Sequence, residues 1–213
     1  MINVIIRWLG HACFHCQGEG VSLLTDPFDE EVGYPLPQVE ADLVTVSHDH
    51  HDHNAVNLLP GTPQVISDIG VHHFQSLEIK GFPVFHDEVK GAKRGDNIIF
   101  VWEMDGLRLC HLGDLGHLLD DTTLNSIGKI DILMVPVGGI FTIDGREARD
   151  VVDQLRPRLV IPMHYKTPHL SFELDVSEKF TLYFDRVCQD KLWQGTAADL
   201  PHEQKVLVLD YLD

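Results

Sequence analysis

Basic side chains are scarce in this sequence. Its 213 residues contain 16 Lys and Arg against 33 Asp and Glu, which gives a formal net charge of −17 at pH 7 with neutral histidines. A charge of this sign repels nucleic acid and anionic membrane surfaces at long range. The composition therefore argues against nucleic acid as a partner.

Long apolar runs and cysteine pairs are also lacking. No apolar run approaches the roughly 18 residues that cross a bilayer, and the N-terminus has neither the basic start nor the small-residue cleavage site of a signal peptide. The four cysteines, at 13, 16, 110 and 188, would suggest a disulfide framework only in an exported chain. Cys13 and Cys16 spell one C-x-x-C, but no second pair completes a zinc clamp. We expect a cytoplasmic protein with free thiols and no membrane insertion.

The first 46 residues read as strands. Short apolar runs at 4–8, 12–16 and 21–25 are separated by glycine turns, which is typical of a β-meander. Residues 41–46 include β-branched side chains and predict a buried strand. Strands and helices then alternate.

Later segments carry clear turn and helix signals. Asp105-Gly106 lies between two apolar runs and predicts a hairpin. Asp144 can cap a helix whose apolar residues recur at helical spacing up to Pro157. Further strands are expected at 159–163 and 206–209, and a weaker helix at 177–187. This order predicts one α/β (α+β) domain over residues 1–213, with two mixed sheets packed together and helices outside.

The segment 47–54 reads Ser-His-Asp-His-His-Asp-His-Asn and contains the pattern H-x-H-x-D-H directly after a predicted strand. It supplies four candidate metal ligands, His48, His50, Asp52 and His53. Imidazole and carboxylate groups bind zinc, and manganese, iron and nickel accept the same donors. The alternative is a flexible, solvated histidine tract. Its internal position and interleaved aspartates disfavour that alternative.

Three further candidates occupy similar positions. His86, Asp114 and His164 each follow an apolar run that we interpret as a strand. Ligands converge at the carboxyl ends of strands in sheets with helical crossovers. We therefore expect the four segments to form one metal site.

This set of residues resembles the metallo-β-lactamase superfamily, whose five motifs correspond to Asp26, the 48–53 segment, His86, Asp114 and His164. The resemblance implies a four-layer αββα sandwich of two mixed β-sheets flanked by helices. It also implies a site with two metal ions. The first would be bound by His48, His50 and His86, the second by Asp52, His53 and His164, with Asp114 bridging.

The same resemblance implies roles for the neighbouring residues. Asp26 would support the site through hydrogen bonds, or it is an ordinary turn aspartate before Pro27. Gly10-His11-Ala12 and the loop at 25–28 are similar to a branch that includes ascorbate-phosphate lactonase and N-acyl-phosphatidylethanolamine phospholipase D. Recognition of the family thus goes further than recognition of a substrate.

The expected activity is hydrolysis by a hydroxide held between two divalent ions, with zinc favoured. It would cleave an ester, lactone or phosphodiester bond of a small molecule. We expect catalytic roles for Asp52, Asp114 and His11. Histidines 111 and 117 could also donate protons or support ligands, and Arg94 and Lys166 could bind an anionic group on the substrate. The alternative for these four side chains and for His11 is an ordinary structural or solvated residue.

Other functions of this fold fit less well. A nuclease needs a surface for nucleic acid, which the charge opposes. The similar di-iron reductases have Glu at the position of His50 and a fused flavin domain, and glutathione thioester hydrolases have a longer C-terminal region. An antibiotic-degrading enzyme would be exported. A catalytically silent metal-binding module and a di-metal oxidoreductase of the same fold remain as alternatives, and the oligomeric state leaves no readable trace.

Overall fold

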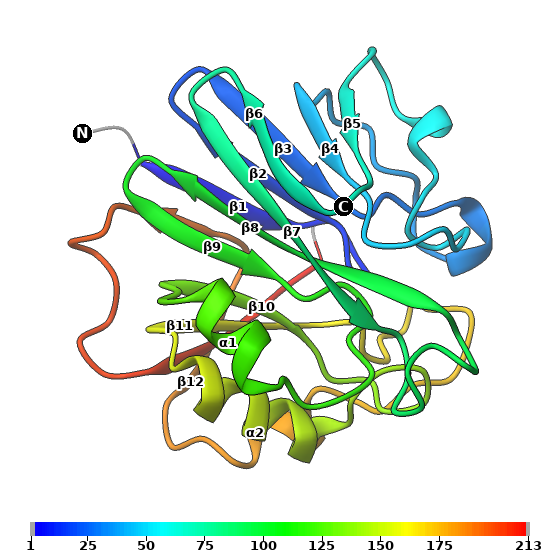
Figure 1. Cartoon of the computed structure of the whole chain (residues 1–213), viewed down its shortest axis with the longest axis vertical. Helices are drawn as coiled ribbons and strands as arrows, with labels where there is room; N and C mark the ends of the chain where they lie inside the picture. Colours follow the sequence, from blue (N-terminus) through cyan, green and yellow to red (C-terminus); the bar gives the residue numbers. More distant parts are fainter. Residues whose placement is uncertain (1–2, 212–213) are drawn as a thin grey trace.

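Two mixed β-sheets pack face to face in the computed structural model, which describes residues 3–211 (Figure 1). The first sheet has the strand order β13 (Trp193–Gly195), β1 (Val4–Trp8), β2 (Phe14–Gly18), β3 (Val21–Thr25), β4 (Leu43–Thr45) and β5 (Gln64–Ile66). The second has the order β12 (Val187–Asp190), β14 (Lys205–Leu209), β11 (Leu159–Met163), β10 (Ile132–Pro136), β9 (Leu107–His111), β8 (Asp96–Met104), β7 (Leu77–Phe85) and β6 (Gly70–Phe74).

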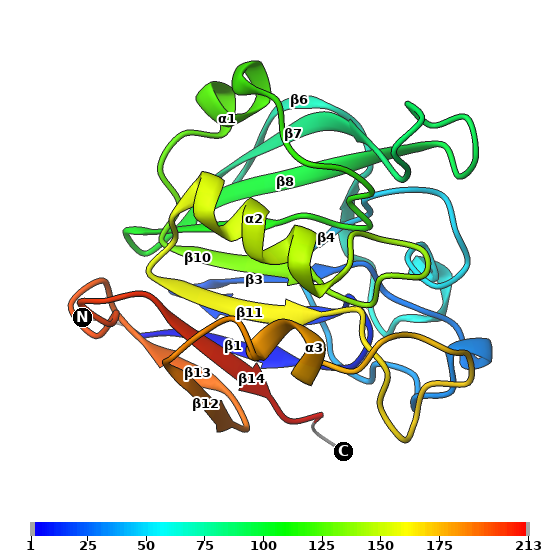
Figure 2. The ribbon, with the colours of Figure 1, turned by 90° about the horizontal axis from the view of Figure 1, so that it is seen from below.

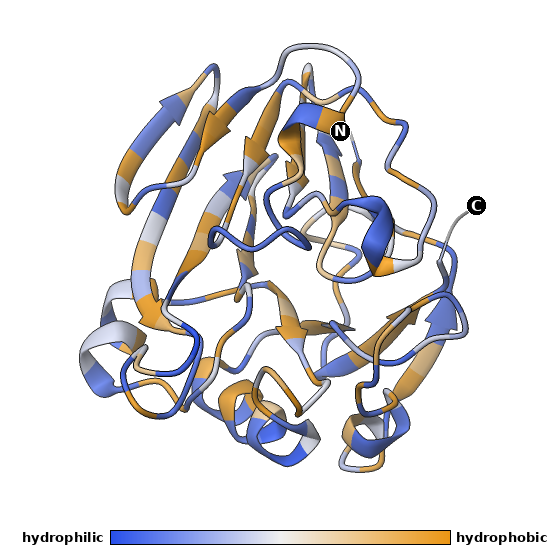
Figure 3. Cartoon of the chain, turned by 90° about the vertical axis from the view of Figure 1, so that its right-hand side faces the viewer, coloured by the Kyte–Doolittle hydropathy of each residue, from blue (hydrophilic) through white to orange (hydrophobic). Residues whose placement is uncertain are grey.

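The strand patterns agree with the sequence. The predicted meander is confirmed, because β1, β2 and β3 pair antiparallel in succession. The predicted hairpin joins β8 to β9, and Asp105 and Gly106 have the positive φ angles, 49° and 79°, that a tight hairpin turn requires. Strands β10 and β11 are parallel and buried at every residue, as continuous apolar runs predict. Buried and more exposed residues alternate along β1 and along most of β7, and Figure 3 shows hydrophobic and hydrophilic residues together on several strands.

The α-helices belong to the connections of the second sheet: α1 (Asp121–Ile127), α2 (Gly145–Leu155) and α3 (Glu178–Thr181) (Figure 2). Helix α2 begins with a capping box formed by Asp144 and Glu147 and buries the predicted apolar stripe of Ala148, Val151, Val152 and Leu155. The crossovers of the first sheet contain only the 3₁₀-helices η1 (Glu30–Val32) and η2 (Val56–Leu58) within the part of the chain described. The predicted sandwich of two mixed sheets is thus confirmed, and its α-helices accompany the second sheet.

The weaker helix expected at 177–187 is largely wrong. Only Glu178–Thr181 forms a helical turn, and Val187 already begins β12. The segment buries Phe180 while Leu182 is 67% exposed, so it has no continuous apolar stripe to hold a longer helix against the sheet.

The core lies between the sheets and joins them. Trp8 and Phe14 of the first sheet belong to one buried cluster with Phe100 and Trp102 of the second. Strands β1, β3 and β4 run in one direction within the first sheet, as do β7, β9, β10 and β11 within the second. Each set therefore places its carboxyl ends along one edge of its sheet. No helix within residues 3–211 is long and apolar enough to span a membrane.

Candidate metal centre

The loops after five strands bring the predicted ligands together at this edge. The segment 48–53 follows β4, His86 follows β7, Asp114 lies three residues after β9, and His164 follows β11. His11 comes from the loop after β1 and joins the same group. The two sheets thus contribute to one cluster, as the positions at strand ends predict.

The cluster contains two groups of ligand atoms. In the first, one side-chain nitrogen each from His48, His50 and His86 lie within 4.8 Å of one another. In the second, ligand atoms of His11, Asp52, His53 and His164 meet the same limit. These are the two sets that the resemblance implied, with His11 added to the second.

Asp114 lies between the two groups. Its Oδ2 is 3.1 Å from Nε2 of His86 and 3.1 Å from Nε2 of His164, and its Oδ1 is 3.3 Å from Nε2 of His53. One carboxylate therefore touches a histidine of the first group and two of the second. The Asp114 carboxylate would therefore be available to a cation held by either group.

Several buried polar atoms of the cluster lack a hydrogen-bond partner among the described residues. They include Nε2 of His48, Nε2 of His53 and Oδ1 of Asp114. Buried polar atoms left unsatisfied cost about 1–3 kcal/mol each. Because imidazole nitrogens and a carboxylate oxygen are metal donors, divalent ions would satisfy all three. The residues present therefore fit a metal centre.

The electrostatics also favour cations. Burial and the neighbouring His53 lower the pKa of His48 to about 3, and burial and His86 lower the pKa of His50. Burial alone would raise the pKa of Asp114, but His164 and His53 outweigh it and lower this pKa well below its usual range. Neutral imidazoles beside ionised carboxylates are the forms that bind metal.

His53 differs from His48 and His50 in the direction of its pKa shift. Burial alone would lower its pKa, but Asp114, Asp52 and Asp26 outweigh burial and raise the pKa well above its usual range. Without a metal ion, His53 is therefore protonated, and its positive charge balances the nearby carboxylates. A divalent ion would replace that proton, because ligation needs the free Nε2.

Asp26 supports a ligand in each group, which resolves the choice left open by its sequence context. Its Oδ2 accepts hydrogen bonds from Nδ1 of His53 at 2.8 Å and from the Ser47 hydroxyl at 2.6 Å. That hydroxyl is 2.9 Å from Nδ1 of His48, so it accepts from His48 while donating to Asp26. The network thus places a proton on Nδ1 of both histidines, so that Nε2 is the atom that each would offer to a metal ion.

Backbone strain is concentrated in the same loops. His11, Asp26 and His164 have φ angles of 51°, 38° and 52°, in the left-handed region that non-glycine residues seldom adopt. Gly113, with φ of 54°, precedes Asp114, and a Cβ atom there would lie 2.3 Å from Oδ1 of Asn97. Such strain is typical of functional sites, where packing fixes a costly geometry.

The other predicted polar residues are placed differently. Nε2 of His111 is 2.9 Å from the Ala12 carbonyl, and Nε2 of His117 accepts from the Phe85 amide. The Lys166 ammonium group donates to the carbonyls of Leu170 and Phe172. All three side chains interact with backbone groups, which supports a structural role for His111, His117 and Lys166.

A cavity of about 380 Å³ opens onto the cluster. Its lining includes ligand candidates of both groups, Arg94, and two aromatic side chains that sequence reasoning missed, Phe141 and Phe172. No local pattern marks these phenylalanines, since each comes from a loop. Ser47 and Asn97 were also missed, although Ser47 directly precedes His48.

The cysteines do not contribute to this centre. All four are free thiols, as predicted. Cys13 and Cys16 are buried in different apolar clusters, and burial raises the pKa of both thiols. The C-x-x-C sequence is therefore neither a reactive pair nor part of a metal clamp.

Comparison with known proteins places this geometry in a family. A family model described as a beta-lactamase superfamily domain matches residues 5–164. The UPF0173 metal-dependent hydrolase of Thermococcus onnurineus is 31% identical over 192 residues, covering 77% of this chain and 85% of that protein. This chain belongs to the metallo-β-lactamase superfamily, as its motifs predict.

Solved structures agree. A Thermotoga maritima protein, proposed to be a Zn-dependent hydrolase of the same superfamily, has a TM-score of 0.83 and 42% identity, with 97% of this chain and 98% of that chain covered. Igni18, a metallo hydrolase from Ignicoccus hospitalis, has a TM-score of 0.69 with 99% and 97% coverage. At 21% identity this second likeness concerns the fold alone.

Proposed function

We propose that this protein is a hydrolase that uses two divalent metal ions to cleave an ester, lactone or phosphodiester bond of a small molecule. The observation that carries the proposal is Asp114, whose carboxylate lies between two groups of ligand atoms and is within 3.3 Å of histidines from both. The names of the relatives in Thermococcus and Thermotoga, both called hydrolases, point the same way.

The proposed ligands are His48, His50 and His86 for the first ion and Asp52, His53 and His164 for the second, with Asp114 shared. Zinc is the first candidate because imidazole and carboxylate suit it, and manganese, iron or nickel can use the same donors. Two such ions supply hydroxide at neutral pH and polarise the substrate oxygen. Neither a serine nor a cysteine nucleophile is then required.

Asp52 and His11 act together in this proposal. Nε2 of His11 is 3.1 Å from Oδ2 of Asp52, and burial followed by the charge of His164 lowers the pKa of His11 to about 4. A neutral His11 donates its proton to that oxygen and fixes the carboxylate. The other oxygen of Asp52 is then free to bind the second ion or to accept a proton from attacking water.

The substrate must be small. A cavity of about 380 Å³ admits a compact molecule, and Phe141 and Phe172 give it an apolar wall. Arg94 is the one Lys or Arg among the lining residues, and its guanidinium group suits a carboxylate or phosphate. We therefore infer an anionic group on the substrate.

The test combines metal content with turnover. Elemental analysis of protein purified without chelator should find close to two transition-metal ions per chain. Substitutions His48→Ala and His164→Ala should each remove one ion, while His73→Ala, at an exposed position on β6, should remove none. A screen of p-nitrophenyl esters, phosphodiesters and lactones should find turnover that chelator abolishes.

Each other outcome contradicts part of the proposal. Absence of metal after reconstitution would refute the ligand assignment. Two bound ions without turnover of any ester would favour a catalytically silent metal-binding module. Oxygen consumption with bound iron, in place of hydrolysis, would favour a di-metal oxidoreductase.

A further inference from the structure

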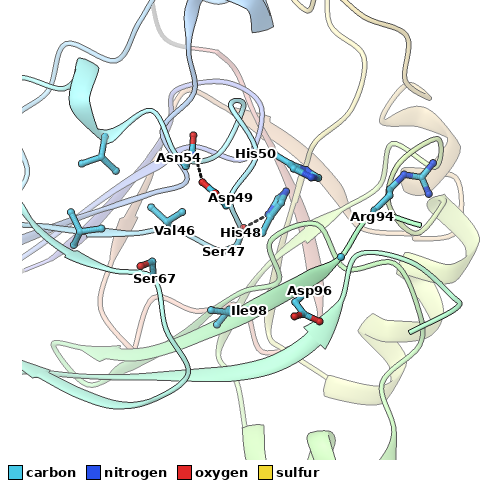
Figure 4. A pocket seen from close by; sticks show the side chains of 13 residues that line it. Val46, Ser47, His48, Asp49, His50, Asn54, Ser67, Arg94, Asp96 and Ile98 are labelled. Carbon is cyan, nitrogen blue, oxygen red and sulfur yellow. Dashed lines mark hydrogen bonds between the residues drawn. The ribbon is translucent and has the colours of Figure 1, made fainter. Parts of the chain in front are cut away.

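A second cavity of about 600 Å³ adjoins the metal centre on its outer side. It lies where the loops after β4 and β5 face the start of β8, between the two sheets (Figure 4). His50 and Arg94 line both this groove and the smaller metal cavity. These two side chains therefore stand at the boundary between the groove and the metal cavity.

Part of the groove is lined by aliphatic side chains. The aliphatic side chains that line the groove are Val46, Val56, Val65 and Ile98, with the small polar side chains of Asn54 and Ser67 beside them, and Val65 is 43% exposed. Figure 4 shows Val46 and Ile98 on the opposite side of the groove from Arg94. Covering such side chains with an apolar group removes their surface from water and favours binding.

Charge divides the groove into two parts. Asp49 and Asp96 are exposed at its rim and disfavour an anion there. Arg94 is the one Lys or Arg among the described residues that line either cavity, and it stands at their junction. An oxyanion is thus favoured at the junction, and an uncharged chain is favoured in the groove.

The loop that carries Arg94 is built to hold it in place. The buried Asp87 carboxylate accepts hydrogen bonds from the backbone amides of Val89, Gly91, Lys93 and Arg94, at 2.8–2.9 Å. Across the metal cavity, the Arg94 guanidinium group donates to the Ile140 carbonyl at 3.1 Å and lies 5.5 Å from the centre of the Phe141 ring. A cation fixed in this way loses little freedom when it binds a ligand.

We propose that the groove binds the aliphatic chain of the substrate while Arg94 binds an oxyanion of the same molecule at the junction. This inference rests on the proposed hydrolase function, in which the bond to be cleaved lies beside Asp114. The substrate would then be a linear aliphatic compound with one anionic group. The oxyanion can be a carboxylate or a phosphate, since Arg94 recognises both.

Calorimetric titration of the metal-loaded protein with octanoate, butyrate, octyl phosphate and octylamine tests the proposal. Octanoate should bind at least ~10-fold more tightly than butyrate, because four more methylenes enter the groove. Octylamine should bind at least ~10-fold more weakly than octanoate, because it lacks the group that Arg94 recognises. Comparison of octanoate with octyl phosphate identifies the preferred oxyanion. Equal affinity for octanoate and butyrate would overturn the groove assignment.

Two variants separate the parts of the site. Val65→Trp should fill the groove and abolish the preference for octanoate over butyrate. Val71→Trp, at another exposed valine on the edge strand β6, should preserve it. Arg94→Met should lower the binding affinities for octanoate and for butyrate by the same factor. Unchanged carboxylate affinity in Arg94→Met would overturn the role of Arg94.

Failure of this inference can be distinguished from failure of the proposed function. Chelator-sensitive hydrolysis of p-nitrophenyl acetate reports the metal centre, and its acyl group is too short to reach the groove. Turnover without any preference for longer chains refutes the groove alone. A preference for longer chains without turnover refutes the hydrolase function and leaves a binding site for aliphatic anions.

Discussion

Substitution of Asp26 by Asn should weaken both metal positions although Asp26 binds neither ion in our assignment. The buried carboxylate accepts hydrogen bonds from Ser47 and His53, and the Ser47 hydroxyl in turn accepts one from His48. An asparagine has the same shape, but its amide nitrogen can only donate. If that nitrogen faces His53, the histidine must move its proton to Nε2, which is the atom needed for the metal.

The expected magnitude follows from the bonds that change. Loss of a hydrogen bond that orients a histidine ligand lowers metal affinity by roughly 10- to 100-fold, which corresponds to about 1.4–2.7 kcal/mol. The introduced side-chain amide can still accept from the Ser47 backbone N–H, but the two contacts at Oδ2 lose their charge. Such bonds are worth roughly 1.5–3 kcal/mol each and are not additive, so we expect the metal-free variant to lose about 2–4 kcal/mol of unfolding free energy.

The assay is competition for zinc against a chromophoric chelator, with urea unfolding of the metal-free protein measured alongside. Asp29→Asn is the matched control, because Asp29 also pairs with a histidine, His51, at 3.1 Å, but on the exposed side of the same loop. This control should lose under ~1 kcal/mol of stability. Wild-type zinc affinity for both ions in Asp26→Asn would refute the assignment of the tautomers.

Three other predictions follow from the structure. Chelator should lower the melting temperature by ~16–32 °C in differential scanning calorimetry, because each of two ions held at about a thousand times its dissociation constant stabilises the fold by ~4 kcal/mol; an unchanged melting temperature would contradict a metal centre. Gly113→Ala should lower the unfolding free energy measured in urea by about 3 kcal/mol or more, since its Cβ would lie 2.3 Å from Oδ1 of Asn97. Gly106→Ala, at φ of 79° with no described atom within 4 Å, should lower it by only ~1 kcal/mol, and equal decreases would exclude the steric explanation. Burial, followed by the charge of Arg7, lowers the pKa of His15 from 6.5 to about 4, so its contribution to stability is present above pH 6.5 and is lost as the pH falls to 4. When metal-free protein is unfolded in urea at these two pH values, the unfolding free energy of His15→Phe should fall by roughly 1–3 kcal/mol less than that of the wild type; equal decreases would contradict the shift.

Much of the fold could be predicted because its signals are local. Short apolar runs and glycine turns identified the meander, Asp105-Gly106 identified the hairpin, and Asp144 marked the start of α2. The helix expected at 177–187 failed because tertiary packing, not propensity, decides whether a weakly apolar segment remains helical.

The sequence by itself determined which ligand types stand at which strand ends, because chain order and strand direction fix the edge of the sheet that each loop reaches. Only the tertiary structure decided the contacts at that edge. It placed His11 beside Asp52, joined Asp26 to His48 through Ser47, and turned Lys166 towards backbone carbonyls. These contacts join residues that are distant in the chain or that share no periodic pattern. Their partners are chosen by differences of a few ångströms, which only the packing of two sheets against each other sets.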